Sequence, residues 1–269
     1  MDRRLALVTG ASAGIGEAFA RIYAARGWDV AITARRAERL DRLARELRAD
    51  LGVSAYAIAD DLGDPAAPTR ILERLAAEGR VADALVNNAG YGVPGHYADT
   101  AWADQAAFLQ VMTVAPSELA HRLVGGMAAR GFGRIVNVAS LAALVPGAAG
   151  ATLYAASKAF LVRFSQSLHL ETLGQGVHVT ALCPGFTWSE FHDVTGSRAQ
   201  VSRGVPRWAW MSSGAVAAAG YAAVEANHPV CTPGVANKAA ALLAKALPER
   251  VGLAVMRAQG PRMRGRYGA

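Results

Sequence analysis

The residues best suited to chemistry are a tyrosine and a lysine, Tyr154 and Lys158, in a segment whose apolar residues have helical spacing. Residues four apart share a face of an α-helix, so we expect these side chains to lie side by side. Acid–base work near neutrality needs a tyrosine pKa roughly 3 units below its usual value of about 10, on the order of 4 kcal/mol. A neighbouring ammonium shifts the pKa in that direction. The pair indicates proton transfer, although an ordinary helix with a buried tyrosine and a solvent-reaching lysine has the same spacing.

A glycine-rich turn near the amino end has the properties of a phosphate-binding site. The segment from Thr9 to Gly16, TGASAGIG, joins a predicted strand to a predicted helix. Glycine permits the positive φ and the close backbone approach that such a turn needs. The free amides and the dipole at the start of a helix suit a pyrophosphate. The spacing differs from Gly-x-Gly-x-x-Gly, so that fingerprint does not apply literally.

The same turn has a second interpretation, because Gly10 to Gly14 matches the Gly-x-Ser-x-Gly nucleophile elbow of hydrolases. Ser12 would then be the nucleophile of a serine hydrolase. Two features disfavour this. The turn follows the first predicted strand, whereas several strands normally precede the elbow, and the last histidine, His228, has no evident catalytic setting. The hydrolase stays a remote alternative.

Two arginines follow the second predicted strand. This strand runs into Arg35 and Arg36, and no acid appears until Glu38. A site that prefers NAD places an acid at this point for the ribose 2′-hydroxyl. Arginine instead pairs with a 2′-phosphate through charge-assisted hydrogen bonds. Alternatively, the two arginines belong to the solvated start of an ordinary helix and bind no ligand. The sequence therefore predicts NADP(H) in preference to NAD(H).

The elements that position these residues alternate along the chain. The predicted strands are short, apolar on both faces and rich in Val, Ile and Leu, as in a sheet covered by helices on both sides. They span Leu5–Thr9, Asp29–Thr33, Val53–Ile58, Ala84–Asn87, Gly133–Ala139 and Gly176–Leu182. The predicted helices span Gly14–Arg26, Glu38–Leu51, Pro65–Gly79, Trp102–Arg130 and Leu153–Leu173. This alternation predicts a parallel sheet with right-handed crossovers and ligands at the carboxyl ends of its strands.

A resemblance to a known family rests on five motifs. The turn at Thr9–Gly16, the sequence Asn87-Asn88-Ala89-Gly90, Ser140, Tyr154-x-x-x-Lys158 and Pro184-Gly185 resemble, in order and spacing, the short-chain dehydrogenase/reductase family. The resemblance covers nearly the whole chain. It implies one Rossmann-type, doubly wound α/β domain over residues 1–269 with a seven-stranded parallel sheet. It also implies NAD(P)-dependent oxidation of alcohols or reduction of carbonyls.

The resemblance implies a role for each candidate residue. Tyr154 would protonate the carbonyl oxygen as hydride reaches its carbon, Ser140 would hydrogen-bond the same oxygen, and Lys158 would also hold the nicotinamide ribose. Asp61 and Leu62 would contact adenine, although Asp60 leaves this register uncertain by one. The predicted coenzyme contacts are Gly10, Ser12, Gly14, Ile15, Gly16, Arg35, Arg36, Asp61, Leu62, Asn88, Ala89, Gly90, Tyr154, Lys158, Pro184, Gly185, Thr187 and Ser189.

One position departs from the family. Members usually carry an asparagine in the helix before the serine strand, where it holds a water in a proton relay; counting back from Leu119 and Met127 places Met112 there. A thioether cannot replace an amide in a hydrogen-bonded chain, and Thr113 lies about 100° further round the helix. Either the register is off by one, the relay uses other water, or the enzyme is slow. The main alternative function is therefore a silent family member that binds NADP(H) without efficient turnover.

Two segments bear on the substrate and the surface. Residues 186–211 correspond to the family's variable substrate lid, whose aromatic residues predict an apolar or aromatic carbonyl substrate touched by Trp188, Phe191 and His192. Packing of the lid onto the body explains the aromatics equally well. Residues 248–269 form a basic extension. We expect a solvated tail there, with contact to an anionic membrane or to a partner subunit as alternatives.

Composition limits the function classes. The 269 residues carry 28 Lys+Arg against 21 Asp+Glu, a net charge of +7, but scattered arginines are weak support for a nucleic-acid partner. An apolar fraction of 52% excludes intrinsic disorder. The six histidines and two cysteines show no metal-ligand spacing and no disulfide framework, which predicts no metal and a cytoplasmic location.

Members of the family usually form homodimers or homotetramers, so we expect a homo-oligomer. Substrate identity, reaction direction and stereochemistry stay open.

Overall fold

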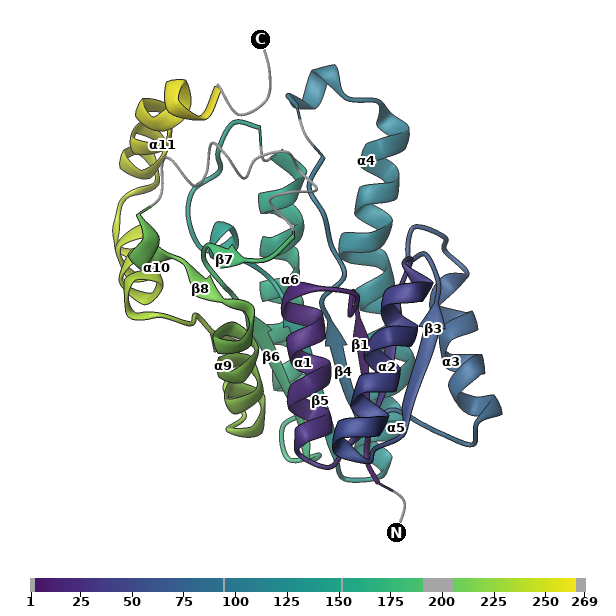
Figure 1. Ribbon diagram of the computed structural model, residues 1–269. Helices are drawn as coiled ribbons and strands as arrows, with labels where there is room; N and C mark the ends of the chain where they lie inside the picture. The colour runs from purple at the N-terminus through teal and green to yellow at the C-terminus, as the bar shows by residue number, and fades with distance from the viewer. Residues whose placement is uncertain (1–2, 94, 151, 191–205, 265–269) are drawn as a thin grey trace.

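The computed structural model describes residues 3–93, 95–150, 152–190 and 206–264. Its centre is a seven-stranded parallel sheet in the order β3-β2-β1-β4-β5-β6-β9 (Figure 1). The strands are β1 (Leu5–Thr9), β2 (Asp29–Ala34), β3 (Ala55–Ala59), β4 (Ala84–Asn87), β5 (Gly133–Val138), β6 (Val177–Leu182) and β9 (Val230–Cys231). Six of these agree with the predicted strands to within two residues. The predicted doubly wound α/β fold with seven parallel strands is confirmed.

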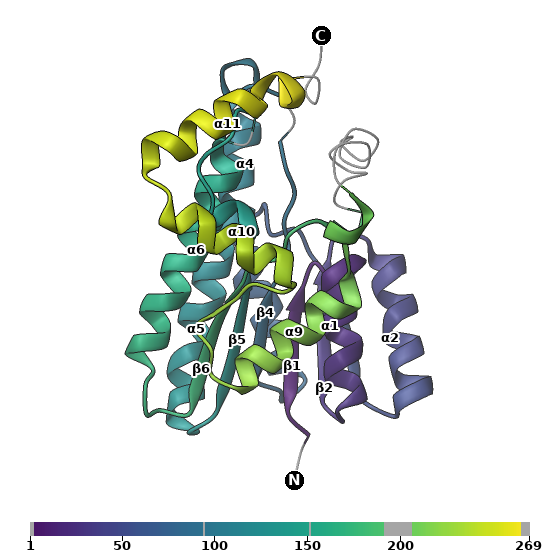
Figure 2. The same ribbon diagram turned by 90° about the vertical axis from the view of Figure 1, so that its left-hand side faces the viewer.

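Helices cover both faces of the sheet (Figure 2). One layer contains α1 (Gly14–Ala25), α2 (Ala37–Leu51) and α9 (Ser213–Glu225), and the other contains α3 (Ala67–Ala77), α5 (Ala115–Ala129) and α6 (Thr152–Glu171). Successive side chains of a strand point to opposite faces. Ala6 and Val8 of β1 therefore pack in the core under α1 and α2, while Leu5 and Leu7 pack in the core under α3 and α5. This two-sided burial explains the apolar runs in the sequence.

The long helix predicted from residue 102 to 130 is wrong in one respect. It is divided into α4 (Trp102–Leu109), a π-helical turn η2 (Gln110–Val114) and α5. A π-helical turn widens the helix locally and often occurs at functional sites. Its hydrogen-bond pattern leaves no signature in apolar spacing, so the residues alone predict a continuous helix.

The chain after β6 contains elements that the sequence did not reveal. β9 has only two residues, too few to show a period, and pairs with Ala181 and Leu182 of β6. Helices α9, α10 (Val235–Ala246) and α11 (Glu249–Arg264) also lie in this part. The segment predicted as a solvated tail is therefore helical as far as Arg264. Within α11, Gly252 is buried and an added Cβ would lie 2.7 Å from Cγ of Pro146, so the helix rests on the loop that precedes α6.

Smaller elements complete the carboxyl-terminal side of the sheet. They are η1 (Tyr97–Asp99), η3 (Leu141–Ala143), η4 (Arg207–Ala209) and the two-stranded sheet of β7 (Thr187–Trp188) and β8 (Met211–Ser212). The rings of Trp188 and Trp210 stack with centroids 4.2 Å apart. In the described part of the lid, these aromatics thus pack against each other.

Candidate active site

Tyr154 and Lys158 lie one turn apart on α6, with the lysine Nζ 5.9 Å from the centre of the tyrosine ring. Lys158 is buried, and its Nζ donates a hydrogen bond of 2.7 Å to the carbonyl oxygen of Val138 at the end of β5. Ser140 lies two residues after the end of β5, and its Oγ accepts a hydrogen bond of 3.1 Å from the amide of Ala142. The end of one strand and the first turns of one helix thus bring the three predicted catalytic residues to one place.

Burial lowers the pKa of Lys158 to about 8, because removal from water disfavours the charged amine. The buried thiol of Cys183 acts weakly in the opposite direction. At neutral pH the amine is still mainly an ammonium, which is the charge that a neighbouring phenol needs in order to become more acidic. The amine is nevertheless close to its point of deprotonation.

These residues line a cavity of about 840 Å³ that opens at the carboxyl ends of the strands. Most of the predicted coenzyme contacts line the same cavity, from five different strand ends. They are Gly10, Ser12, Gly14, Ile15, Arg35, Arg36, Asp61, Leu62, Asn88, Ala89, Gly90, Pro184, Gly185, Thr187 and Ser189, together with Ser140, Tyr154 and Lys158. The parallel topology explains this convergence, because all of these loops leave the sheet at one edge.

Two predicted site residues do not line the cavity, and two others lie outside the described residues. Gly16 lies inside the first turn of α1, where an added Cβ would be 2.4 Å from the carbonyl oxygen of Gly10. Its role is therefore close packing of the turn. Trp188 stacks on Trp210 instead of lining the cavity. Phe191 and His192 fall in the segment 191–205, which the structure does not describe.

The glycine turn fits a pyrophosphate. Gly10 has a φ of +64°, and an added Cβ would be 2.8 Å from the Cα of Ala89, so the turn tolerates only glycine there. Ala13, the residue before α1, provides no side-chain cap for the first amides of the helix. Those N–H groups are left for an anion. A narrow glycine cradle, uncapped amides and two arginines on the same cavity together match the donor set that a phosphorylated dinucleotide needs.

Ser12 does not have the surroundings of a hydrolase nucleophile. Its Oγ accepts hydrogen bonds from Nε and Nη2 of Arg36, at 3.1 and 2.8 Å. A serine nucleophile needs a general base within hydrogen-bond reach, and no histidine is found among the described residues that line the cavity. The hydrolase interpretation of the turn therefore has no support in the geometry.

The ends of β1 and β4 are joined by hydrogen bonds from the predicted Asn-Asn-Ala-Gly motif. Nδ2 of Asn88 donates to the carbonyl oxygen of Thr9 at 2.9 Å, and Oγ1 of Thr9 accepts from the amides of Asn88 and Ala89 at 2.9 and 3.0 Å. Asn87 is buried, and its Nδ2 donates to Oδ1 of Asn137 on β5 at 2.8 Å. The motif thus ties three neighbouring strands together directly beneath the cavity.

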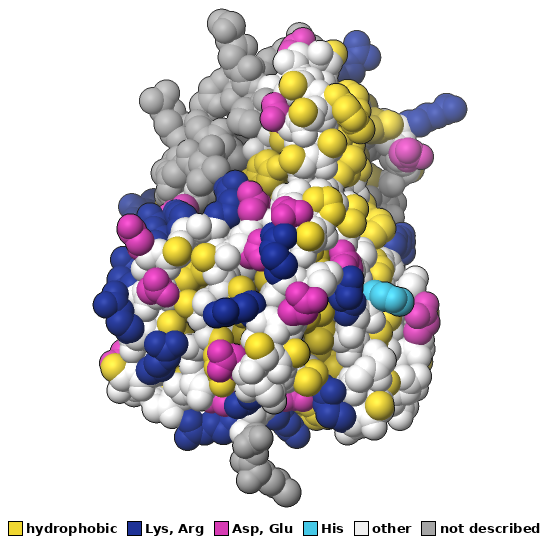
Figure 3. All heavy atoms as spheres, turned by 90° about the vertical axis from the view of Figure 1, so that its right-hand side faces the viewer, with side chains coloured by type: hydrophobic (Ala, Val, Ile, Leu, Met, Phe, Trp, Pro, Cys, Tyr) yellow, Lys and Arg dark blue, Asp and Glu magenta, His cyan; other side chains and the backbone are white. Residues whose placement is uncertain are grey.

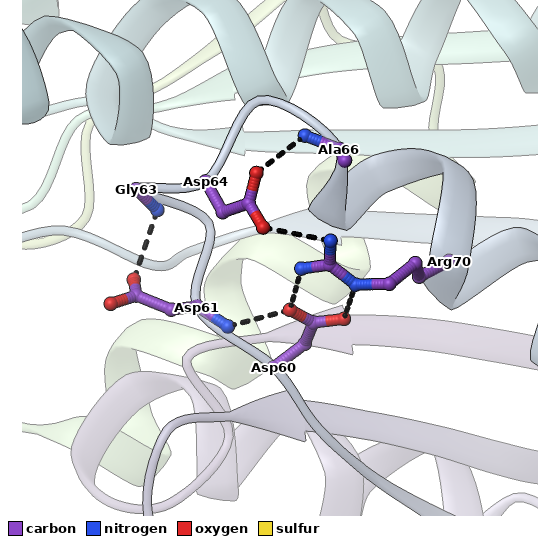
Figure 4. Close-up of polar contacts among 6 residues, drawn as sticks. All are labelled: Asp60, Asp61, Gly63, Asp64, Ala66 and Arg70. Carbon is purple, nitrogen blue, oxygen red and sulfur yellow. Dashed lines mark hydrogen bonds and ion pairs between the residues drawn. The ribbon is translucent and has the colours of Figure 1, made fainter.

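The structure distinguishes the two aspartates after β3. Asp60 turns toward α3, where its carboxylate accepts hydrogen bonds of 2.6 and 3.1 Å from Arg70 (Figure 4). Arg70 also pairs with Asp64 at 2.7 Å. One carboxylate oxygen of Asp61 instead accepts a hydrogen bond of 2.9 Å from the amide of Gly63. Asp61 is also more exposed than Asp60. Asp61 is therefore the aspartate available on this side of the cavity.

Met112, which the sequence count places where the family carries asparagine, packs against Gly90, a residue that lines the cavity. It lies in η2, is buried, and has its Sδ 2.9 Å from the Cβ position of Gly90. Nζ of Lys158 is 3.8 Å from the same Cβ position. Thr113 points elsewhere, since its hydroxyl donates to the carbonyl oxygen of Leu109 at 2.6 Å. The thioether of Met112 and the amine of Lys158 thus both lie close to Gly90.

The cavity is also lined by residues that sequence reasoning missed. Val145, Pro146 and Met256 are among them, and Met256 comes from α11, about a hundred residues beyond Tyr154 in the sequence. No spacing rule connects an apolar residue in a carboxyl-terminal helix to a pocket at the sheet edge. The packing of Gly252 against Pro146 places that helix beside the loop that lines the pocket.

Other site classes find no basis in the described residues. Within them no group of three or more His, Cys, Asp or Glu side chains is placed to hold a metal ion. In the part of the chain that the structure describes, no helix is both long and apolar enough to cross a membrane. Cys183 is fully buried, and burial raises the pKa of its thiol to about 12, so it is a packing residue at neutral pH.

Comparison with known proteins agrees with this geometry. The short chain dehydrogenase family model matches residues 4–199. Serine 3-dehydrogenase of Agrobacterium fabrum (strain C58 / ATCC 33970) is 38% identical over 191 residues, which cover 69% of this chain and 72% of that protein. A short-chain dehydrogenase from Sphingobium yanoikuyae, solved in complex with NADPH, has a TM-score of 0.78 at 31% identity and covers 94% of this chain and 95% of its own.

A second solved structure is also similar. The bulky-bulky ketone specific alcohol dehydrogenase from Comamonas testosteroni has a TM-score of 0.75 at 28% identity, with 97% of this chain and 94% of that chain covered. The chain belongs to the short-chain dehydrogenase/reductase family, and it is an NAD(P)-dependent oxidoreductase that acts on CH–OH or C=O groups.

Proposed function

We propose that this protein interconverts a carbonyl and an alcohol on an apolar or aromatic small molecule, with NADP(H) preferred over NAD(H). The observation that carries the proposal is the convergence of Ser140, Tyr154 and Lys158 with the glycine turn on one cavity. NADPH, when bound, supplies the hydride. The chain must therefore supply the proton, the polarising hydrogen bond and a dry pocket.

The chain's own groups divide this work. Ser140 donates a hydrogen bond to the substrate oxygen and stabilises the negative charge that develops there. Tyr154 donates its phenolic proton to the same oxygen. The ammonium of Lys158 favours the phenolate that remains, because an opposite charge nearby stabilises the ionised form. Lys158 is held in position by its hydrogen bond to Val138 and by burial around its stem.

Preference for NADP(H) is supported by the end of β2. Arg35 and Arg36 both line the cavity, where a site suited to NAD carries an acid. Guanidinium groups recognise phosphate through paired, charge-assisted hydrogen bonds. Relatives point the same way, since the structure from Sphingobium yanoikuyae contains NADPH and a related Escherichia coli (strain K12) enzyme is an NADP-dependent 3-hydroxy acid dehydrogenase.

The substrate class is inferred from the lining of the cavity. Leu141, Val145, Pro146, Phe186 and Met256 line the same cavity as the candidate catalytic residues. Apolar lining residues contribute little to the binding of a charged or heavily hydroxylated substrate. They favour an apolar substrate, because its binding removes apolar surface from water. The similar enzyme that is specific for bulky-bulky ketones is consistent with this inference.

A panel of apolar and polar carbonyl compounds, assayed with NADPH and with NADH, tests the proposal. We expect NADPH oxidation with apolar ketones or aldehydes, slower turnover with NADH, and loss of turnover in Tyr154→Phe. Met112, a thioether where the sequence count expects an asparagine, favours a second candidate, in which the chain binds NADPH but turns over poorly. Tight NADPH binding without oxidation in any member of the panel would favour that candidate.

We also infer a homo-oligomer in the cytoplasm. Large apolar side chains are exposed on α4 and α6, namely Trp102, Phe160 and Leu170. Figure 3 shows hydrophobic side chains gathered on the upper part of one face, where α4 lies, while ionic side chains dominate the lower part. Such an apolar patch is typical of a protein interface. Analytical ultracentrifugation should give a sedimentation coefficient above that of a monomer, and a monomer at micromolar concentration would contradict it.

A further inference from the structure

An ion-pair cluster at the rim of the cavity joins the segment after β7 to the start of α2. The two carboxylate oxygens of Glu190 accept hydrogen bonds from Nη1 of Arg36 at 2.7 Å and from Nη1 of Arg39 at 2.6 Å. On its other edge, Arg36 donates through Nε and Nη2 to Ser12 in the glycine turn. The guanidinium of Arg36 is thus engaged on both edges by the chain itself.

Arg35 differs from its neighbour. It is exposed and lines the same cavity, yet within the described residues it forms no side-chain hydrogen bond or ion pair. It lies close enough to Tyr91, which also lines the cavity, to oppose the rise in the pKa of that phenol. The two arginines predicted to recognise a 2′-phosphate are therefore unequal, because one is open and the other is occupied.

The Glu190 carboxylate that pairs with Arg36 is an anion, as is the proposed ligand, the 2′-phosphate. A carboxylate that bridges two guanidinium groups uses the same N–H donors that a phosphate would use. Glu190, Arg36 and Ser12 all line the cavity, so this anion lies within the coenzyme site. Ser189, the preceding residue, has its Cβ 3.0 Å from the Cβ position of Gly14, which seats the segment directly against the phosphate turn.

We propose that Glu190 is an internal competitor for the 2′-phosphate of NADP(H) and thereby sets the coenzyme selectivity of the site. The proposal rests on the proposed preference for NADP(H). A 2′-phosphate can bind Arg35 alone, or it can displace Glu190 and gain Arg36 and Arg39 as well. In either case the negative charge of Glu190 opposes it. NAD(H) carries no phosphate at this position, so Glu190 neither competes with it for the arginines nor repels a phosphate charge.

The strength of this competition is modest. The side chains of Glu190, Arg36 and Arg39 are 38–44% exposed, so water and salt weaken their pairing. We expect removal of the Glu190 charge to strengthen binding of a 2′-phosphate about three- to fivefold at low ionic strength, an effect at the upper end of the range of exposed ion pairs. The gain should shrink as salt is added.

The test measures the Kd of 2′,5′-ADP and of 5′-ADP for the full chain by isothermal titration, in wild type, Glu190→Gln and Glu38→Gln. Glu38 is an exposed acid in the first turn of α2 with no ion pair among the described residues, so it controls for the lost negative charge. We expect Glu190→Gln to bind 2′,5′-ADP about three- to fivefold more tightly, with 5′-ADP changed less than about twofold. Glu38→Gln should match wild type for both. Equal melting temperatures verify that all three proteins are folded.

A double variant locates the effect. If Glu190 acts through Arg36, the gain seen in Glu190→Gln should be smaller when Arg36→Ala is also present. Unchanged or weaker 2′,5′-ADP binding in Glu190→Gln would overturn the proposal and would assign Glu190 to positioning of Arg36. Wild-type protein that binds 2′,5′-ADP no better than 5′-ADP would instead count against the proposed NADP(H) preference. In that case, selectivity that emerges in Glu190→Gln still supports competition, and its absence overturns both.

Discussion

Lys158 offers a prediction in which stability, not only activity, depends on the catalytic site. The amine is buried, its hydrogen-bond partner is the neutral carbonyl of Val138, and no carboxylate pairs with it among the described residues. Burial lowers its pKa to about 8. In the unfolded chain the same amine titrates near the ordinary lysine value of about 10.4. Folding therefore costs free energy whenever this amine is charged.

The sign and size follow from proton linkage. Between the two pKa values the unfolded chain binds more protons than the folded one, so the free energy of unfolding rises with pH. Below pH 8 the full cost of burying the charge is present, roughly 3 kcal/mol at 1.36 kcal/mol per pKa unit. Between pH 7 and pH 9 this cost should fall by about 1 kcal/mol.

The variant Lys158→Met isolates this contribution. It keeps an apolar side chain but removes the amine and leaves the Val138 carbonyl without that donor, at a cost of about 1–3 kcal/mol that does not depend on pH. Urea unfolding at pH 7 and pH 9 is measured for wild type, Lys158→Met and Lys245→Met, the last being an exposed lysine on α10. Wild type should gain about 1 kcal/mol relative to Lys158→Met as the pH rises, and Lys245→Met should follow wild type. A difference between wild type and Lys158→Met that is the same at both pH values would refute the reasoning.

Three further predictions concern packing in and around the cavity. Gly16→Ala places a Cβ 2.4 Å from the Gly10 carbonyl, so calorimetry should show a loss of about 1–3 kcal/mol in stability and weaker NADPH binding; wild-type affinity would contradict the close packing. Gly252→Leu should move α11 away from Pro146 and raise the KM for an apolar ketone while the Kd of NADPH stays constant; an unchanged KM would separate α11 from the substrate. Met112→Asn should raise kcat and lower stability by about 1–3 kcal/mol through burial of an amide; an unchanged kcat would mean that the proton relay is not limiting.

Much of the site was predictable because the fold converts sequence order into position. Once the β–α alternation indicates a parallel sheet, every loop after a strand must emerge at the same edge. Thr9, Asn87, Ser140 and Pro184 are far apart in the sequence, but each stands at or just after the end of such a strand. The helical repeat was enough to place Tyr154 and Lys158 side by side, whereas their role was inferred from the resemblance to the family.

What resisted prediction depends on contacts between distant elements. The π-helical turn that holds Met112 replaces one helical hydrogen-bond pattern by another without changing which residues are apolar. The contact between Gly252 and Pro146 joins segments about a hundred residues apart, and it cannot be predicted from the types of the two residues. The same holds for Glu190, which reads as one acid in a variable segment until it is found between Arg36 and Arg39.

The order of residues along the chain thus determined the sheet, the glycine turn and the placement of the candidate catalytic residues, because each depends on local periodicity or on the direction of parallel strands. Only the tertiary structure decided which charges meet and which amine loses its water. Pairing of Glu190 with two arginines and burial of Lys158 are consequences of distance and solvent exclusion. Neither quantity is a property of a single segment, since each is fixed by the elements that surround it.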